Sequence, residues 1–110
     1  MPVIQAEVTV GAGATNSNIV AGSAFEYSRG RQLLSMGVTA AATATFVTIQ
    51  SGADVILEES ATPIATRFPI VPDEMYYNDI MEMFDRLRVQ IRNTAGAGIV
   101  VRTLAMLTPL

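Results

Sequence analysis

The chain has 110 residues, enough for one domain with its own core, and contains neither cysteine nor histidine. A disulfide scaffold, a thiolate zinc site and the Ser–His or Cys–His pairs of nucleophilic enzymes are therefore excluded. The net charge of −3 does not fit a general nucleic-acid binder, which needs a basic face.

Half of the residues are apolar and only 15% are charged, against about 25% in an average soluble domain. So few charges predict that partners cover part of the surface. Every basic residue is arginine, which suits protein interfaces, although the codon usage of a GC-rich genome would give the same bias.

The chain start lacks the charged and apolar regions of a signal peptide, so none is predicted. The uncharged stretches Val8–Phe25 and Gln32–Ala53 are rich in Thr, Ser and Gly, and we expect no membrane span from them.

Short strand-like runs separated by Gly, Asn and Ser fill the first half of the chain. They cover Val3–Val10, Ile19–Ser28, Arg31–Ala40, Thr43–Gln50 and Asp54–Glu59. The glycines at Gly11-Ala12-Gly13 lack the Lys-Ser/Thr of a phosphate-binding loop and are interpreted as a turn.

Residues 60–75 contain Pro63, Pro69 and Pro72, which predicts a loop or an edge strand. The apolar pattern of Met75–Phe84 fits the period of a strand and that of a helix. We favour a strand entered from Pro72-Asp73, with a short helical turn near Asp79–Phe84 as an open alternative.

The last third shows the clearest alternation of apolar and polar side chains. Leu87, Val89 and Ile91 alternate with polar residues, and a loop over Thr94–Gly98 leads into a second run at Ile99–Leu107. These two runs predict a β-hairpin. The whole pattern predicts one all-β domain over residues 1–110, a two-sheet antiparallel β-sandwich of Greek-key or jelly-roll type with about eight short strands. Residues 1–18 form either its first strand or an extended arm.

In that hairpin, Leu87, Val89 and Ile91 would face Ala105, Thr103 and Val101 across an inner surface. The opposite face carries a candidate protein interface of aliphatic and arginine side chains: Arg88, Arg92, Val100, Arg102, Leu104 and Met106. Alternatively, another strand, the amino-terminal arm or the Pro-rich loop of the same chain covers this face. A register slip of one residue would exchange the two faces.

Acidic side chains gather in the middle of the chain, at Asp73, Glu74, Asp79, Glu82 and Asp85. Carboxylate pairs can act as acid and base or bind calcium, but the spacing matches no calcium loop. We interpret these residues as solvated or arginine-paired, and Glu58-Glu59 as a solvated strand end. Tyr76-Tyr77 could stack on a sugar or a base, but packing is the preferred interpretation. We therefore predict no catalytic, cofactor or metal site, and no enzyme activity.

Three segments resemble parts of the small jelly-roll decoration, or cement, proteins of bacteriophages. They are Phe84–Thr94 with Gly96 and Gly98, the ending Val100–Leu110, and the strand pair Phe46–Val55. The resemblance implies a virion protein, made in the host cytoplasm, that binds the capsid exterior. It also implies that the protein bridges major capsid proteins as a homo-oligomer, typically a trimer, and needs no cofactor, nucleic acid, membrane or small-molecule substrate.

The alternative function is a carbohydrate-binding β-sandwich from a tail fibre or a lectin. Such a module needs exposed aromatic rings beside carboxylates or amides. Aromatic residues make up only 6% of this chain and tryptophan is absent, which counts against that function.

Overall fold

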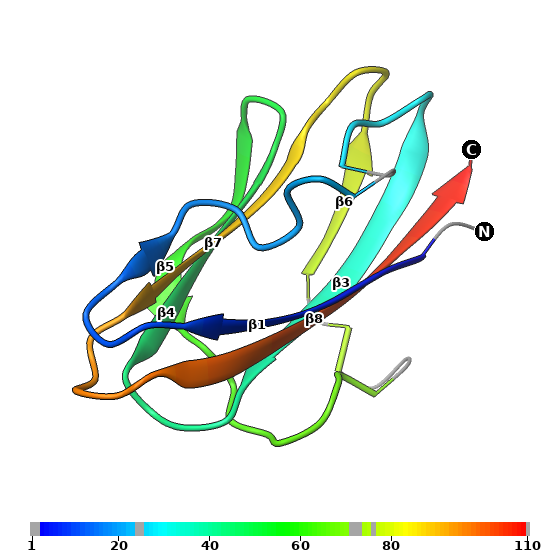
Figure 1. The fold of residues 1–110 in the computed structure, drawn as a ribbon. Helices are drawn as coiled ribbons and strands as arrows, with labels where there is room; N and C mark the ends of the chain where they lie inside the picture. Colours follow the sequence, from blue (N-terminus) through cyan, green and yellow to red (C-terminus); the bar gives the residue numbers. More distant parts are fainter. Residues whose placement is uncertain (1–2, 24–25, 71–73, 76, 110) are drawn as a thin grey trace.

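The computed structural model describes residues 3–23, 26–70, 74–75 and 77–109. These residues form strands and loops but no helix (Figure 1). The strands are β1 (Val3–Val10), β2 (Thr15–Asn16), β3 (Gln32–Ala40), β4 (Thr45–Ser51), β5 (Asp54–Ala61), β6 (Tyr77–Met81), β7 (Leu87–Asn93) and β8 (Ile99–Pro109). The runs predicted at Val3–Val10, Arg31–Ala40 and Thr43–Gln50 are thereby confirmed.

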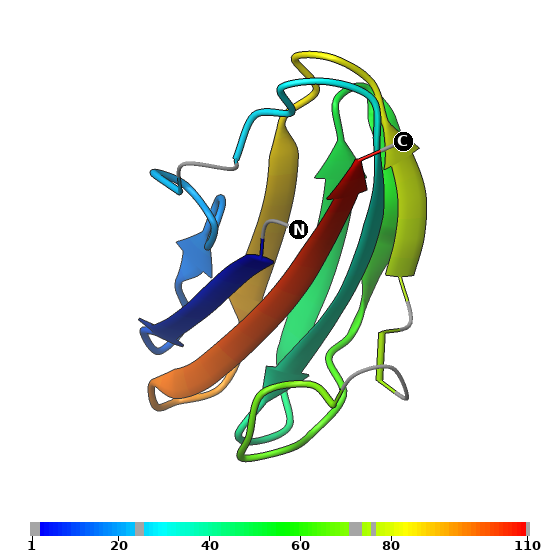
Figure 2. The ribbon, with the colours of Figure 1, turned by 90° about the vertical axis from the view of Figure 1, so that its right-hand side faces the viewer.

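The strands pair as a nested series, the first with the last and so on inward. β1 pairs with β8, β2 with β7, β3 with β6 and β4 with β5, all antiparallel. The added pairings β3–β8 and β4–β7 roll this series into two four-stranded sheets, ordered β1-β8-β3-β6 and β2-β7-β4-β5. The sheets lie face to face (Figure 2). This connectivity is that of a jelly roll, which confirms the predicted fold class.

The core lies between the two sheets and comes from alternate residues of each strand. In β7 and β8 every second side chain is buried and its neighbours are half-buried. Leu34, Ile49 and Leu87 are fully enclosed, and burial of such a side chain stabilises the fold by about 1.5–3 kcal/mol. Prediction of the inner set from period two is therefore confirmed.

The predicted hairpin is wrong, because β7 and β8 belong to different sheets. The loop after Asn93 crosses from one sheet to the other. The side-chain Nδ2 of Asn93 donates to the carbonyls of Val10 (2.9 Å), Gly11 (3.2 Å) and Ala97 (2.9 Å). This amide therefore ties the β7–β8 crossing to the end of β1.

The strand predicted at Ile19–Ser28 is also wrong within its described part. The Oδ1 of Asn18 accepts hydrogen bonds from the N–H groups of Val20 (3.2 Å) and Val89 (3.1 Å). Gly22 then adopts a φ of 85°. These local bonds turn the chain, and only Tyr27 forms an isolated bridge, to Arg86.

The Pro-rich segment between β5 and β6 runs across the outer face of β3. Pro63 accepts a backbone hydrogen bond from Ala40 (2.9 Å), and the carbonyl of Arg67 accepts one from the Thr39 hydroxyl (2.6 Å). The segment is a loop, as predicted at Pro63 and Pro69, whereas Pro72 lies outside the described residues. The helical turn left open near Asp79–Phe84 does not form; after β6 the chain makes a single turn closed by Asp85 N–H on the Glu82 carbonyl (3.2 Å).

Gly37 sits where this segment presses on β3. A methyl group there would lie 2.8 Å from Cβ of Pro69 and against the Glu74 carbonyl. Gly37→Ala should therefore lower the free energy of unfolding by about 1–3 kcal/mol in urea denaturation, because the segment must shift.

Gly96→Ala is the matched control, since a methyl group at Gly96 meets nothing within 4 Å. Equal stability of the two variants would contradict the close packing of the Pro-rich segment on β3.

Candidate interaction surfaces

The six predicted interface residues do not form one surface. Arg88 and Arg92 lie on the outer face of the sheet that contains β7, and the other four (Val100, Arg102, Leu104 and Met106) lie on the outer face of the sheet that contains β8. The two outer faces point to opposite sides of the sandwich. The single contact surface is therefore a wrong prediction, and its cause is the wrong hairpin. A role in contacts for each residue stays a prediction.

The arginines on β7 bind groups of their own chain. Arg92 lies over the Phe46 ring, 4.9 Å from its centroid, and forms an ion pair with Glu59. Hydrogen bonding from Arg92 lowers the pKa of the Glu59 carboxyl. Arg88 donates from Nε to the Ser17 carbonyl (3.0 Å). Both arginines therefore already have partners within their own chain.

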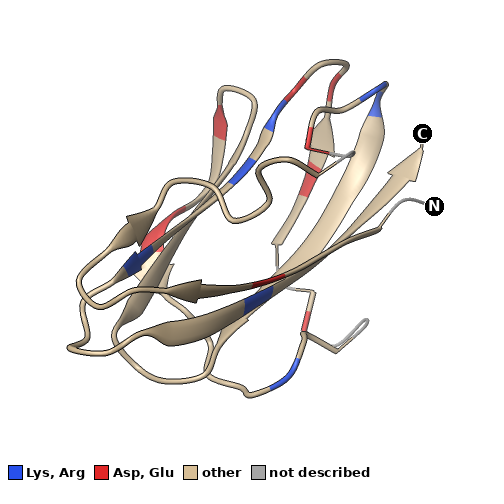
Figure 3. Cartoon of the chain, viewed as in Figure 1, with Lys and Arg blue, Asp and Glu red and all other residues tan. Residues whose placement is uncertain are grey.

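The aliphatic side chains on β8 are half-buried by their own chain. β1 lies beside β8 on one side and β3 on the other, and the Pro-rich segment covers the neighbouring Gly37. Arg102 pairs with Glu7 at 2.9 Å, the adjacent blue and red segments on β8 and β1 in Figure 3. The alternative prediction, that other segments of the same chain cover this face, therefore holds for part of it.

Phe84, the most exposed apolar residue in the described part of the chain, lies elsewhere, at one end of the sandwich; Ile64, the next most exposed, lies in the Pro-rich segment. We define the apolar tip as Tyr27, Met83 and Phe84, whose side chains are 55%, 57% and 77% exposed. The β6–β7 loop carries Met83 and Phe84 at the top of Figure 1. Leu33 and Ile80, directly opposite each other on β3 and β6, are also exposed and continue this surface down the outer face.

The tip is held by a set of backbone hydrogen bonds. Phe84 N–H donates to the Ser28 carbonyl (2.8 Å), and Ser28 N–H donates to the Asp85 carbonyl (2.8 Å). Phe84 adopts a φ of 69°, a left-handed conformation that is rare for a bulky side chain. Because the two segments fix each other, the exposed ring is presented by a constrained backbone.

Ion pairs surround the apolar tip. Arg31 pairs with Glu82 at 3.3 Å, and Arg86 pairs with Glu26 while lying 5.9 Å from the centroid of the Tyr27 ring. An apolar centre with a charged rim is the usual anatomy of a protein interface. The sequence does not predict this surface, because the pattern that contains Met83 and Phe84 fits both a strand and a helical turn.

Glu26 anchors that rim from a buried position, with 6% of its surface exposed. Burial alone would raise the pKa of its carboxyl, but hydrogen bonds from Gly22 N–H and Arg86, with the charge of Arg86, lower it overall. Its Oε2 also accepts from Nδ2 of Asn18 (3.2 Å), which donates as well to the Leu87 carbonyl (3.1 Å). This network joins the segment after β2 to β7.

The acidic residues of the middle section do not gather into a site. Within the described residues, no group of three potential metal ligands occurs. Glu74 bonds to Arg67, which lowers the pKa of the Glu74 carboxyl, and Glu82 pairs with Arg31. Asp79 lies on β6 opposite Leu34, and Asp73 lies outside the described residues.

The other residues considered as possible sites in the sequence lie in turns, in strands or against the core. Gly11-Ala12-Gly13 is a turn, closed by Ala14 N–H on the Gly11 carbonyl (3.0 Å), as predicted. Glu58 and Glu59 lie within β5 rather than at its end. Tyr77 packs against the core, and Tyr76 lies outside the described residues. No helix in the described part of the chain could cross a membrane.

The chain matches no family model, no curated protein and no solved structure. Its function must therefore be argued from its own surfaces.

Glu26→Gln should reduce the acid sensitivity of the fold. Because the folded-state pKa of Glu26 lies below its ordinary value of 4.5, its contacts stabilise the fold above that value and are lost as pH falls through the lower pKa. The variant should be less stable by about 1–3 kcal/mol at neutral pH, and this difference should shrink on acidification.

Urea denaturation at neutral pH and near pH 3 measures this difference in unfolding free energy. Glu58→Gln, at an exposed position on β5, is the control and should follow the unmodified protein. A constant difference between Glu26→Gln and the unmodified protein across this range would contradict the charged network.

Proposed function

We propose that this chain is a structural subunit of a virus shell, a decoration or cement protein that binds the capsid exterior. In this function it bridges neighbouring major capsid proteins and acts without chemistry, since contacts made only in the assembled state stabilise that state. The apolar tip is the observation that supports it.

The tip offers the contact area that such binding needs. Phe84 and Met83 are more than half exposed and Tyr27 flanks them. Transfer of each large apolar side chain from water into an interface would contribute about 1.5–3 kcal/mol. The Arg31–Glu82 and Arg86–Glu26 pairs would lie at the rim, where they exclude wrong partners more than they add affinity.

The backbone at Phe84 supports a role outside the fold. A φ of 69° in a non-glycine residue costs of the order of 1–3 kcal/mol. The Phe84 ring is 77% exposed and therefore returns little of that cost through packing within its own chain. A binding partner that covers the ring would offset the strain.

The fold is compatible with the proposal but does not establish it. Eight-stranded jelly rolls serve as capsid subunits, and they also serve as lectins and other modules. Among the described residues two aromatic rings are exposed, those of Tyr27 and Phe84, and they favour carbohydrate binding as the second candidate function. Arg86 already lies over Tyr27, however, and the carboxylate of Glu82 is paired with Arg31.

Mass spectrometry of the purified source particle tests the proposal. A decoration protein should be present in a fixed ratio to the major capsid protein and should be released before the shell dissociates. Absence of the chain from particles, together with binding on a glycan array, would favour the second function.

Phe84→Gly should separate binding from stability. Glycine removes the anchoring ring and relieves the left-handed strain, so co-sedimentation with shells should be lost while the unfolding free energy stays equal or rises by about 1 kcal/mol.

Ala44→Gly is the matched control, because Ala44 has a φ of 77° and lies outside the tip. It should relieve similar strain and leave co-sedimentation intact. Undiminished binding of Phe84→Gly would overturn the role of the tip.

A further inference from the structure

β1 differs from the other edge strands of the two sheets. β2 is only two residues long, β6 has five, and β5 carries two register shifts and two glutamates. These features are known means by which sheets avoid pairing with other chains. β1 is eight residues long, pairs with β8 without a register shift, and carries one charged residue, Glu7. In the described chain, no strand pairs with its other edge.

The direction of the free backbone groups on β1 follows from the neighbouring ladder. The N–H of Ala40 donates to the Pro63 carbonyl (2.9 Å), and the Ala40 carbonyl accepts from Ala65 N–H (3.0 Å). The backbone groups of Ala40 therefore point away from β8. Its partner Val101 must then direct its backbone groups toward Val8 on β1, because antiparallel pairs alternate between bonded and non-bonded.

By the same alternation, the even-numbered residues of β1 bond to β8. The odd-numbered ones, Val3, Gln5, Glu7 and Thr9, direct their N–H and C=O groups to the open edge. The edge therefore offers a regular row of donors and acceptors to an added strand.

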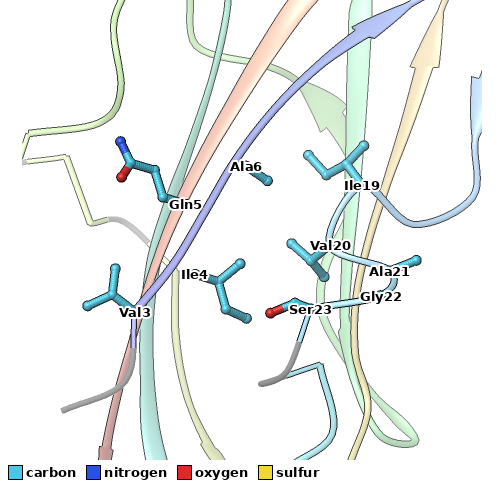
Figure 4. A pocket seen from close by; sticks show the side chains of 9 residues that line it. All are labelled: Val3, Ile4, Gln5, Ala6, Ile19, Val20, Ala21, Gly22 and Ser23. Carbon is cyan, nitrogen blue, oxygen red and sulfur yellow. The ribbon is translucent and has the colours of Figure 1, made fainter.

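Two grooves run along this edge. One, of about 420 Å³, lies between residues 3–6 and the turn at residues 19–23, with Ile4, Ala6 and Val20 in its wall. Figure 4 shows the side chains of Ile4 and Ala6 directed toward that turn, while Val3 and Gln5 point away. The second groove, of about 360 Å³, lies between Thr9-Val10 and residues 14–17. An added strand would find space on its inner side, beside the apolar side chains of Ile4, Ala6 and Val20.

We propose that β1 pairs with β1 of a second copy of this chain, antiparallel, about a two-fold axis through Ala6. The two sheets would join into one continuous sheet across the dimer. A contact of this kind is self-complementary, as a two-fold interface requires.

The register follows from face and charge. Inner residues must meet inner residues, so the axis must pass through a residue rather than between two. An axis at Glu7 would place two carboxylates opposite each other, and an axis at Gln5 would pair only residues 3–7. The axis at Ala6 pairs residues 3–9 and sets Gln5 opposite Glu7 of the second copy.

Packing favours the same register. Ala6 would face Ala6 in a non-bonded pair, where the two backbones approach most closely and a small side chain fits. Ile4 would face Val8 of the second copy. Ala6 and Val8 are half-buried in the single chain, and the groove lined by Ile4 and Ala6 would accept Val8 of the second copy.

This pairing stands independently of the proposed function. It predicts two-fold association through β1, whereas the resemblance to cement proteins implies a trimer. Loss of β1 pairing would leave shell binding through the apolar tip unaffected, and the reverse also holds.

Charge changes at Gln5 provide the test, with sedimentation velocity over a concentration series. Gln5→Glu sets two carboxylates opposite each other at two symmetric positions and should weaken the dimer about tenfold. Gln5→Lys sets a cation opposite Glu7 and should tighten it by a similar factor. The same changes at Asn78, exposed on the opposite edge strand β6, should leave the dissociation constant unchanged.

Amide hydrogen exchange of the unmodified protein provides a second readout. Exchange at Gln5, Glu7 and Thr9 should slow as protein concentration rises, whereas exchange along β6 should not. A monomer at millimolar concentration, or a dimer whose affinity is the same in both Gln5 variants, would overturn the proposal.

Discussion

Each strand of this domain must bury alternate side chains in one shared core, and the rest of the structure depends on that constraint. Leu87, Val89 and Ile91 fill the core from one sheet, while Val101 and Ala105 fill it from the other. Because the inner faces must stay about 10 Å apart, the outward half of every strand is fixed in direction. What remains free is how those outward residues, the edges and the end loops are covered. The described residues cover them with ion pairs and with the Pro-rich segment, and leave the apolar tip and the edge of β1 open.

Period two in the sequence predicts which side chains of a strand face inward, and this part of the prediction is confirmed in β7 and β8. It does not state which strand lies alongside. The polar loop after Asn93 suits both a hairpin and a crossing between sheets, and the choice is made by carbonyls of Val10 and Gly11, which lie far away in the sequence. The prediction of the candidate interface rested on the hairpin and was wrong for the same reason. Its residues were correctly assigned to outward positions, but to one face where there are two.

The apolar tip and the open edge of β1 were harder to predict from the sequence. Met83 and Phe84 fall in a pattern that fits both a helix and a strand, so their exposure could not be predicted. Their exposure arises because the Phe84 N–H bonds to the carbonyl of Ser28, which lies on a segment much earlier in the chain. The open edge of β1 likewise depends on which strands lie side by side, since β8 takes β1 and β3 as its two neighbours and leaves β1 at the edge. The sequence does carry a signal for each surface. For the apolar tip it is the pair of large apolar residues directly before Asp85-Arg86, and for the edge of β1 it is a regular strand with a single charged residue.

The left-handed backbone at Phe84 has a consequence for how the sequence can change over time. Most substitutions in a domain lower its stability, yet glycine or asparagine at this position would raise it or leave it unchanged. Random mutation filtered by folding alone would therefore replace this phenylalanine readily. Laboratory evolution of the isolated domain under heat selection should discard it early, whereas propagation inside an intact assembly should keep it.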